Sequence, residues 1–401
     1  MNKEFPPPII SNVPGTWAYS TVRVRLPDIA GRVIEENQFP GEINENLTQL
    51  QEDINHHPIR PLLDQGAPDQ AAWEYYIQPY IGQSWQDVPW FVSEHYFYRR
   101  IVEAVNYYQL GQDPFGYQKT RGLEKTREEI QVLSSLLQER IGNRKDIERT
   151  IRESIYFSLW GNQADLSLWP AGSEDNPTHA SLQSLQDHLL VNDLEQIISL
   201  MFRGKQPLSR VEFLLDNAGF ELISDLALVD VLLNLGLAEQ VILHAKAHPT
   251  FVSDVIPADV QGAIRFLVDQ AESETQSFGN RLEEYARSGR MLTTSHLFWN
   301  SPLPMWELPA DIEEEWRGTS LVISKGDANF RRLLGNLEWD FTLPFDQVVD
   351  YLEPPLAALR TLKAELALGM SPDQIQQVYD RDPDWLVDGR WGVIHFAGGS
   401  S

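Results

Sequence analysis

The chain has 401 residues, of which 42% are hydrophobic, and its formal net charge is −26. This length predicts two domains, or one large domain with an added helical layer. Such an acidic surface disfavours binding to nucleic acid or to an anionic membrane, although clustered Lys and Arg side chains can still attract a small anion locally. The absence of cysteine excludes disulfides, thiol catalysis and cysteine-bound metal centres.

The sequence shows no targeting or membrane-spanning segment. The first residues, MNKEFPPPII, lack the apolar core of a secretory signal. The longest apolar stretch, VDVLLNLGLAEQVILHA, is interrupted by Asp230 and Glu239 and is too short to cross a bilayer. We therefore expect a cytoplasmic protein, and the sequence does not indicate its oligomeric state.

Residues 1–204 are predicted to be mostly helical. The segment 73–100 is rich in aromatic residues, which most often pack in a core. Residues 122–160 carry apolar side chains at helical spacing, with charged residues on the opposite face. Residues 181–202 repeat this pattern, and Asn192-Asp193 could cap a second helix within it.

From residue 205 to 401 the pattern changes to alternating strands and helices. One helix, LISDLALVDVLLNLG, ends at Gly236, and a second is ANFRRLLG. The predicted strands are RVEFLLD, AEQVILHAK, TSLVISKGD and RWGVIHF. This alternation predicts a parallel sheet with helices on its faces.

Polar side chains collect where the predicted strands end, which is where open α/β sheets bind their ligands. They are Asp216, Asn217, Asp254, Lys325, Asp327 and Asn329, with Arg360 and Lys363 before the last strand. Two carboxylates and an amide oxygen suit magnesium or manganese. The basic residues suit a phosphate, and the helix after KGDAN can add N–H donors. Together, these groups predict metal-assisted phosphoryl transfer.

Each of these residues also has a purely structural interpretation. An Asp-Asn pair after a strand is more often a turn or a helix cap than a metal ligand. Asp327 could be the N-cap of its helix, and Arg360 and Lys363 could lie on a solvated face. Only their joint position at consecutive strand ends favours a site.

Several motifs, in order along nearly the whole chain, resemble the metal-dependent damage-control phosphatase family. They resemble most closely the subfamily with an Arg-Thr-x-Lys motif, here Arg360 to Lys363. The motifs are WAYSTVRVRLPDIAGRVIEE, SEHYFYRRI, SLWGNQADLSL, DNAGFELISDL, FVSDV, FWNSPLPMWELP, SKGDANFRRLLG and LRTLKAE.

The resemblance implies a three-layer αβα sandwich with a mostly parallel, Rossmann-like sheet and an N-terminal helical domain. It also implies a divalent ion, namely manganese, cobalt, nickel or magnesium, and a small phosphorylated metabolite such as fructose 1-phosphate or fructose 6-phosphate. The implied metal ligands are Asp216, Asn217 and Asp254, and the implied phosphate contacts run from Asp327 through Asn329 to Arg331, with Lys363. Asn162 and Asp165 are expected to face the same site.

Two other functions stay open. Members of this subfamily are also described as protein-glutamate O-methyltransferases, and Glu221 matches a position assigned there to S-adenosylmethionine. No Gly-rich turn of the G-x-G kind follows a predicted strand to support that cofactor. A non-catalytic binding protein, with residues 73–100 as a partner surface, is the third possibility. Within the phosphatase hypothesis, the nucleophile could be water or an aspartate.

Overall fold

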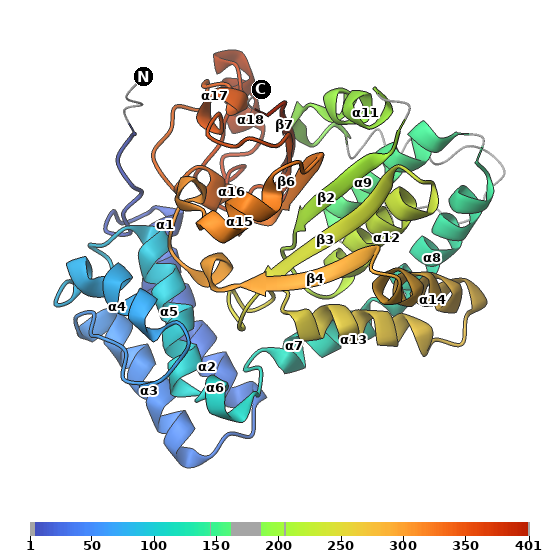
Figure 1. The fold of residues 1–401 in the computed structure, drawn as a ribbon. Coiled ribbons are helices and arrows are strands. Elements are labelled where there is room, and N and C mark those ends of the chain that lie inside the picture. The colour runs from blue at the N-terminus through green and yellow to red at the C-terminus, as the bar shows by residue number, and fades with distance from the viewer. Residues whose placement is uncertain (1–4, 145, 162–185, 204–205, 400–401) are drawn as a thin grey trace.

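The computed structural model describes residues 5–144, 146–161, 186–203 and 206–399. A seven-stranded sheet runs through its centre in the order β1-β7-β6-β5-β2-β3-β4 (Figure 1). The strands are β1 (Leu189–Asn192), β2 (Leu208–Leu214), β3 (Ala238–Lys246), β4 (Met291–His296), β5 (Leu321–Lys325), β6 (Leu356–Thr361) and β7 (Gly392–Ala397).

The helices before the first strand are α1 (Trp17–Ser20), η1 (Thr21–Arg25), α2 (Leu26–Glu36), α3 (Gly41–His56), α4 (Gln70–Ile77), η2 (Gln78–Tyr80), α5 (Trp90–Ala104), α6 (Tyr107–Leu110), α7 (Gly116–Lys125), α8 (Arg127–Gly142) and α9 (Ile147–Trp160). Those after it are α11 (Leu194–Phe202), α12 (Phe220–Asn234), α13 (Pro257–Val268), α14 (Ser273–Arg287), η5 (Leu297–Asn300), η6 (Met305–Glu307), α15 (Ala310–Trp316), α16 (Gly326–Leu333), α17 (Phe345–Val348) and α18 (Pro372–Arg381).

The sheet confirms the predicted α/β class. All neighbouring strands are parallel except β6 and β7, which are antiparallel. The four predicted strands correspond to β2, β3, β5 and β7. β1, β4 and β6 were not predicted, because β4 is an edge strand with mostly exposed polar residues and β6 is rich in alanine.

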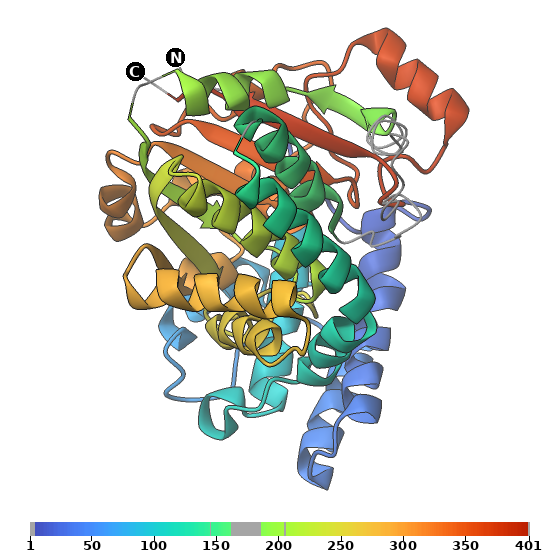
Figure 2. The same ribbon diagram turned by 90° about the vertical axis from the view of Figure 1, so that its right-hand side faces the viewer.

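Helices cover both faces of the sheet. Val211 and Phe213 of β2 point into a core shared with α8, α9 and α11 to α14, whereas Leu214 points into the opposite core. That second core contains α15, α16, α17 and the N-terminal helices. Figure 2 shows α8, α9, α13 and α14 in front of the sheet. The fold is thus a three-layer αβα sandwich with an added helical layer.

The aromatic segment 73–100 packs inside the helical layer, as predicted. The side chains of Trp73, Trp85, Trp90, Tyr96 and Phe97 are almost entirely buried. Most of these residues surround or belong to α5, which lies at the centre of the N-terminal helices (Figure 1).

The division of the chain at residue 204 into two domains stays a prediction, but the sheet draws on both sides of it. β1 precedes this boundary and pairs with β7, and α9 packs against β6. The prediction of helix throughout 181–202 is wrong for Leu189–Asn192, because the LLV run forms an edge strand. Residues 181–185 lie outside the described residues, and α11 begins directly after Asp193.

Among the described residues, no helix has both the length and the apolar character that crossing a membrane requires.

Candidate functional site

The end of β2 and the loop after β3 are joined by backbone hydrogen bonds. Asn217 and Asp254 form an antiparallel bridge. Ala218 N–H donates to the Ser253 carbonyl at 2.7 Å, and Val255 N–H donates to the Asp216 carbonyl at 2.9 Å. Residues directly opposite each other in such a pair have side chains on the same side. The two predicted acidic segments, far apart in sequence, therefore meet.

Four polar side chains converge beside this bridge. Asn217 Nδ2 donates to Asp216 Oδ2 at 2.5 Å and to Glu221 Oε2 at 2.9 Å. Glu221 lies in the first turn of α12, and Ser253 Oγ donates to Asn217 Oδ1. Turning the amide by 180° would exchange its nitrogen for its oxygen, so Asn217 can also offer an oxygen ligand at this point.

The carboxylates of this group are buried, and Asp216 makes no ion pair with the described residues. Burial raises the pKa of Asp216 well above its ordinary value, and the charges of Glu221 and Asp254 raise it further. Burial also raises the pKa of Asp254 to about 6, although Lys246 Nζ, 3.4 Å away, opposes the shift. Asp254 Oδ2 has no hydrogen-bond partner among the described residues.

The N-terminus of α16 touches the Asp216 carboxylate through a glycine. β5 ends at Lys325, and Gly326 begins α16 with a φ of +79°. A Cβ atom on Gly326 would lie 1.9 Å from Asp216 Oδ2. Only glycine therefore allows this approach, in a backbone conformation that also favours glycine.

Lys325 is committed to other protein groups. Its buried Nζ donates to the Ser158 carbonyl at 2.6 Å, to Asp225 Oδ1 at 2.6 Å and to Glu221 Oε1 at 3.3 Å. An ammonium group has three protons, so these partners occupy all of them. The predicted phosphate contact of Lys325 stays untested, but in this structure its charge holds Glu221 and Asp225. Sequence analysis missed Asp225, which lies one helical turn after Glu221 in α12.

Lys363 is differently placed, because its ammonium group makes no hydrogen bond or ion pair with the described residues. Asp327 Oδ1 accepts from Arg360 Nε at 2.8 Å and from Lys363 N–H at 3.3 Å. Arg360 also donates to the carbonyl oxygens of Ala364 and Leu366. Arg360 and Asp327 thus shape the loop that follows β6. The charge of Lys363, in this loop, lowers the pKa of Asp216.

Asn329 and Arg331 bind other parts of the protein. Asn329 Nδ2 donates to the carbonyl oxygens of Leu215 at 3.0 Å and Lys325 at 2.9 Å, so it supports two strand ends. Arg331 Nη1 donates to Glu94 Oε2 at 2.6 Å, and its guanidinium lies 3.7 Å from the centre of the Trp90 ring. Arg331 thereby attaches α16 to α5. The phosphate contacts expected of Asn329 and Arg331 stay predictions. Asn162 and Asp165, which were expected to face the same site, lie outside the described residues.

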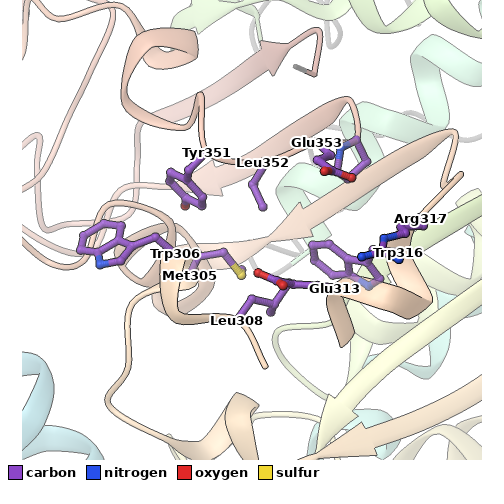
Figure 3. Close-up of a pocket in the computed structure, with 10 residues that line it drawn as sticks. Met305, Trp306, Leu308, Glu313, Trp316, Arg317, Tyr351, Leu352 and Glu353 are labelled. Atoms are coloured by element: carbon purple, nitrogen blue, oxygen red, sulfur yellow. The ribbon is translucent and has the colours of Figure 1, made fainter. Parts of the chain in front are cut away.

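A separate cavity of about 170 Å³ lies at the opposite end of the strands (Figure 3). Its walls include Met305, Trp306 and Trp316, with Tyr351 and Glu353 facing them. Residues 351–354 precede β6 and Arg317 precedes β5, so this cavity lies near the amino ends of these strands. It is therefore not part of the Asp216 site.

The Asp216 site fits a divalent cation. Its ligands would be carboxylate oxygens and an amide oxygen, which hard cations prefer. The raised pKa of Asp216 indicates missing positive charge, and the ion-pair partner of Asp254 Oδ2 among the described residues is the Lys246 ammonium group, 3.4 Å away. Among the described residues, no three His, Asp or Glu side chains are grouped closely enough to hold an ion by themselves. The amide of Asn217, or water and substrate, would have to complete the ligand set.

A family model and several named proteins match this chain over most of its length. The model of the damage-control phosphatase ARMT1-like domain matches residues 21–378. The proteins named damage-control phosphatase ARMT1 from Mus musculus and Homo sapiens are 33% and 31% identical to this chain, over 96% of it and 97% of their own length. A solved structure of a DUF89 family protein from Pyrococcus horikoshii is 14% identical, covers 93% of this chain and 96% of its own, and gives a TM-score of 0.49.

Proposed function

Since the chain belongs to the damage-control phosphatase ARMT1-like family and is therefore a phosphatase, we propose that it hydrolyses small phosphorylated metabolites with a bound divalent metal ion. We propose sugar phosphates, such as fructose 1-phosphate and fructose 6-phosphate, as the substrate class. The observation that carries this proposal is the group of buried carboxylates around Asn217, in which Asp216 makes no ion pair with the described residues and lies within the electrostatic reach of Lys363.

Asp216, Asn217 and Asp254 are the proposed ligands of the ion. When bound, a divalent ion supplies charge stabilisation for the phosphoryl group and lowers the pKa of a coordinated water. Lys363 binds a phosphate oxygen with its ammonium group, which has no hydrogen-bond or ion-pair partner in the described part of the chain. The N–H groups at the start of α16 add donors for the same anion. Glu221 orients Asn217 and is itself held by Lys325.

Removal of the metal should abolish this activity. We expect EDTA to eliminate phosphate release from fructose 1-phosphate and fructose 6-phosphate, and we expect added manganese, cobalt, nickel or magnesium to restore it to different extents. The measurement is inorganic phosphate released by dialysed protein, with each ion titrated separately. Full activity after chelation, confirmed by metal analysis, would contradict the metal role and leave the family assignment intact.

Replacing Gly326 should damage the site from the backbone side. In Gly326→Ala, the new methyl group would meet the Asp216 carboxylate, and the residue would keep an unfavourable positive φ. We expect phosphatase activity to fall about a hundredfold or more, because small displacements of reacting groups have effects of this size. Steady-state kinetics checks this.

Gly318→Ala is the matched control for that variant. Gly318 has a φ of +76°, but a Cβ atom there would meet nothing within 4 Å. This control carries the backbone strain, about 1–2 kcal/mol, without the contact. Equal losses of activity in both variants would show that strain, and not the approach to Asp216, explains the effect.

A further inference from the structure

The helix that begins the N-terminal layer is distorted beside a proline. η1 is a turn of π-helix between α1 and α2, and Leu26 N–H donates to the Thr21 carbonyl. Pro27 has no N–H to donate to the carbonyl of Arg23, four residues earlier. Asn55 Nδ2 donates to that carbonyl instead, at 3.1 Å. Widened turns of this kind are frequent at functional sites, so the side chains that η1 presents are candidates for binding.

The distorted turn lines a cavity of about 680 Å³. Arg25, at the end of η1, and Arg32, two turns further along, lie on its wall. Neither guanidinium makes a hydrogen bond or ion pair with any described residue, although Asp28 and Glu35 lie on the same wall. Two arginines without a partner in the described ranges are notable in a chain with a net charge of −26, and they offer charge to an external anion.

Hydrogen bonds attach this wall to the loop that carries Lys363. The N–H groups of Trp17 and Ala18 donate to the Glu365 carboxylate at 3.0 and 3.4 Å. Glu365 is two residues after Lys363. The segment that presents Arg25 is therefore held against the loop that presents Lys363.

A buried tyrosine connects the same wall to Asp254. Burial raises the pKa of Tyr98, the charges of Arg25 and Arg32 lower it, and the charge of Asp254 raises it. The Tyr98 ring lies 4.9 Å from the ring of Phe251, in the loop that presents Asp254. Tyr98 is therefore within electrostatic reach of both arginines and of the proposed metal ligand.

Few basic side chains near the Asp216 site are left to bind a phosphate group. Lys325 and Arg331 are already bonded within the protein, whereas the Lys363 ammonium group has no hydrogen-bond or ion-pair partner among the described residues. A phosphate monoester is a dianion, and arginine binds phosphate with two parallel hydrogen bonds. We propose that Arg25, assisted by Arg32, binds the phosphate group of the substrate together with Lys363. This proposal rests on the proposed phosphatase function and adds a binding residue from the helical layer.

The test measures phosphate affinity in single-residue variants. Inorganic phosphate is the probe, as a titrant in calorimetry and as a product inhibitor of fructose 6-phosphate hydrolysis. For Arg25→Gln we expect its dissociation constant and the KM to rise about tenfold to a hundredfold, because one charge-assisted contact is lost. For Arg32→Gln we expect a smaller rise, and for Arg25→Lys a partial recovery. Arg23→Gln is the control, since Arg23 lies on the same turn but donates to Asn55 Oδ1 at 3.2 Å.

The outcomes separate this inference from the proposed function. If Arg25→Gln binds phosphate as tightly as Arg23→Gln, the inference is wrong, while phosphate release by the wild type keeps the proposed function. If the wild type releases no phosphate from any monoester, the proposed function is wrong. In that case, if Arg25→Gln binds phosphate more weakly than Arg23→Gln, an anion site at Arg25 is still supported. If the two variants bind phosphate equally well, there is no anion site at Arg25.

Discussion

Asp216→Asn is expected to lower phosphatase activity at least about a thousandfold and, in the absence of metal, to make the protein more stable. The activity falls because a proposed metal ligand loses its charge, and charge stabilisation of the reacting phosphoryl group is usually the largest catalytic contribution. The stability rises because Asp216 is buried beside the acidic groups of Glu221 and Asp254. The asparagine has nearly the same shape and no charge to bury.

The pH dependence of this stability difference has a defined sign. The pKa of Asp216 is raised in the folded state, so the folded protein keeps a proton that the unfolded chain releases. The folded wild type therefore loses stability as pH rises above the ordinary Asp value, by up to about 1.4 kcal/mol per pH unit. Asp216→Asn does not titrate, and its advantage should grow as the pH rises from the ordinary Asp value towards the raised pKa of Asp216.

Urea unfolding of metal-free protein at pH 5, 6.5 and 8 measures this difference. Added manganese should stabilise the wild type by binding only its folded state, and it should stabilise Asp216→Asn far less. A difference that does not vary with pH would contradict the electrostatic explanation. Retained activity in the variant would remove Asp216 from the proposed ligands.

The strand ends could be predicted from sequence because they depend on local patterns. The apolar run before Asp216 and the helical pattern after Gly326 each lie within about ten residues, and α/β topology brings the carboxyl ends of parallel strands to one edge. β6 could not be predicted in the same way. Its sequence LAALRT has no strand preference of its own and becomes a strand because β5 and β7 pair with its two edges.

Which basic residue remains unpaired also could not be predicted from sequence. Lys325 and Lys363 both lie next to strand ends, and composition does not distinguish them. The difference comes from Ser158 in α9 and Asp225 in α12, both more than ninety residues away from Lys325. Arg331 is similar, because its partner Glu94 lies in the helical layer. Such long-range pairing decides which cation can reach a ligand.

Lys325→Met is therefore expected to destabilise the fold, whereas Lys363→Met is expected to impair substrate binding. Removing one partner of a buried ion pair typically costs about 3–5 kcal/mol, because the remaining charge stays buried. Lys325→Met would leave both Glu221 and Asp225 without their cation. Lys363→Met removes a charge that has no ion-pair partner among the described residues. We therefore expect the stability of this variant to stay near that of the wild type. Its KM for fructose 6-phosphate should rise about tenfold or more.

A second substitution tests whether the ion pair itself explains the loss of stability. Lys325→Met combined with Asp225→Leu removes both charges of the 2.6 Å contact, and replacing a buried pair with apolar groups is often neutral or stabilising. We expect the double variant to unfold at a higher urea concentration than Lys325→Met alone. If Lys325→Met is instead as stable as the wild type and raises KM as much as Lys363→Met does, then Lys325 binds the substrate directly. The ion pair with Asp225 would then have to open when the phosphate enters.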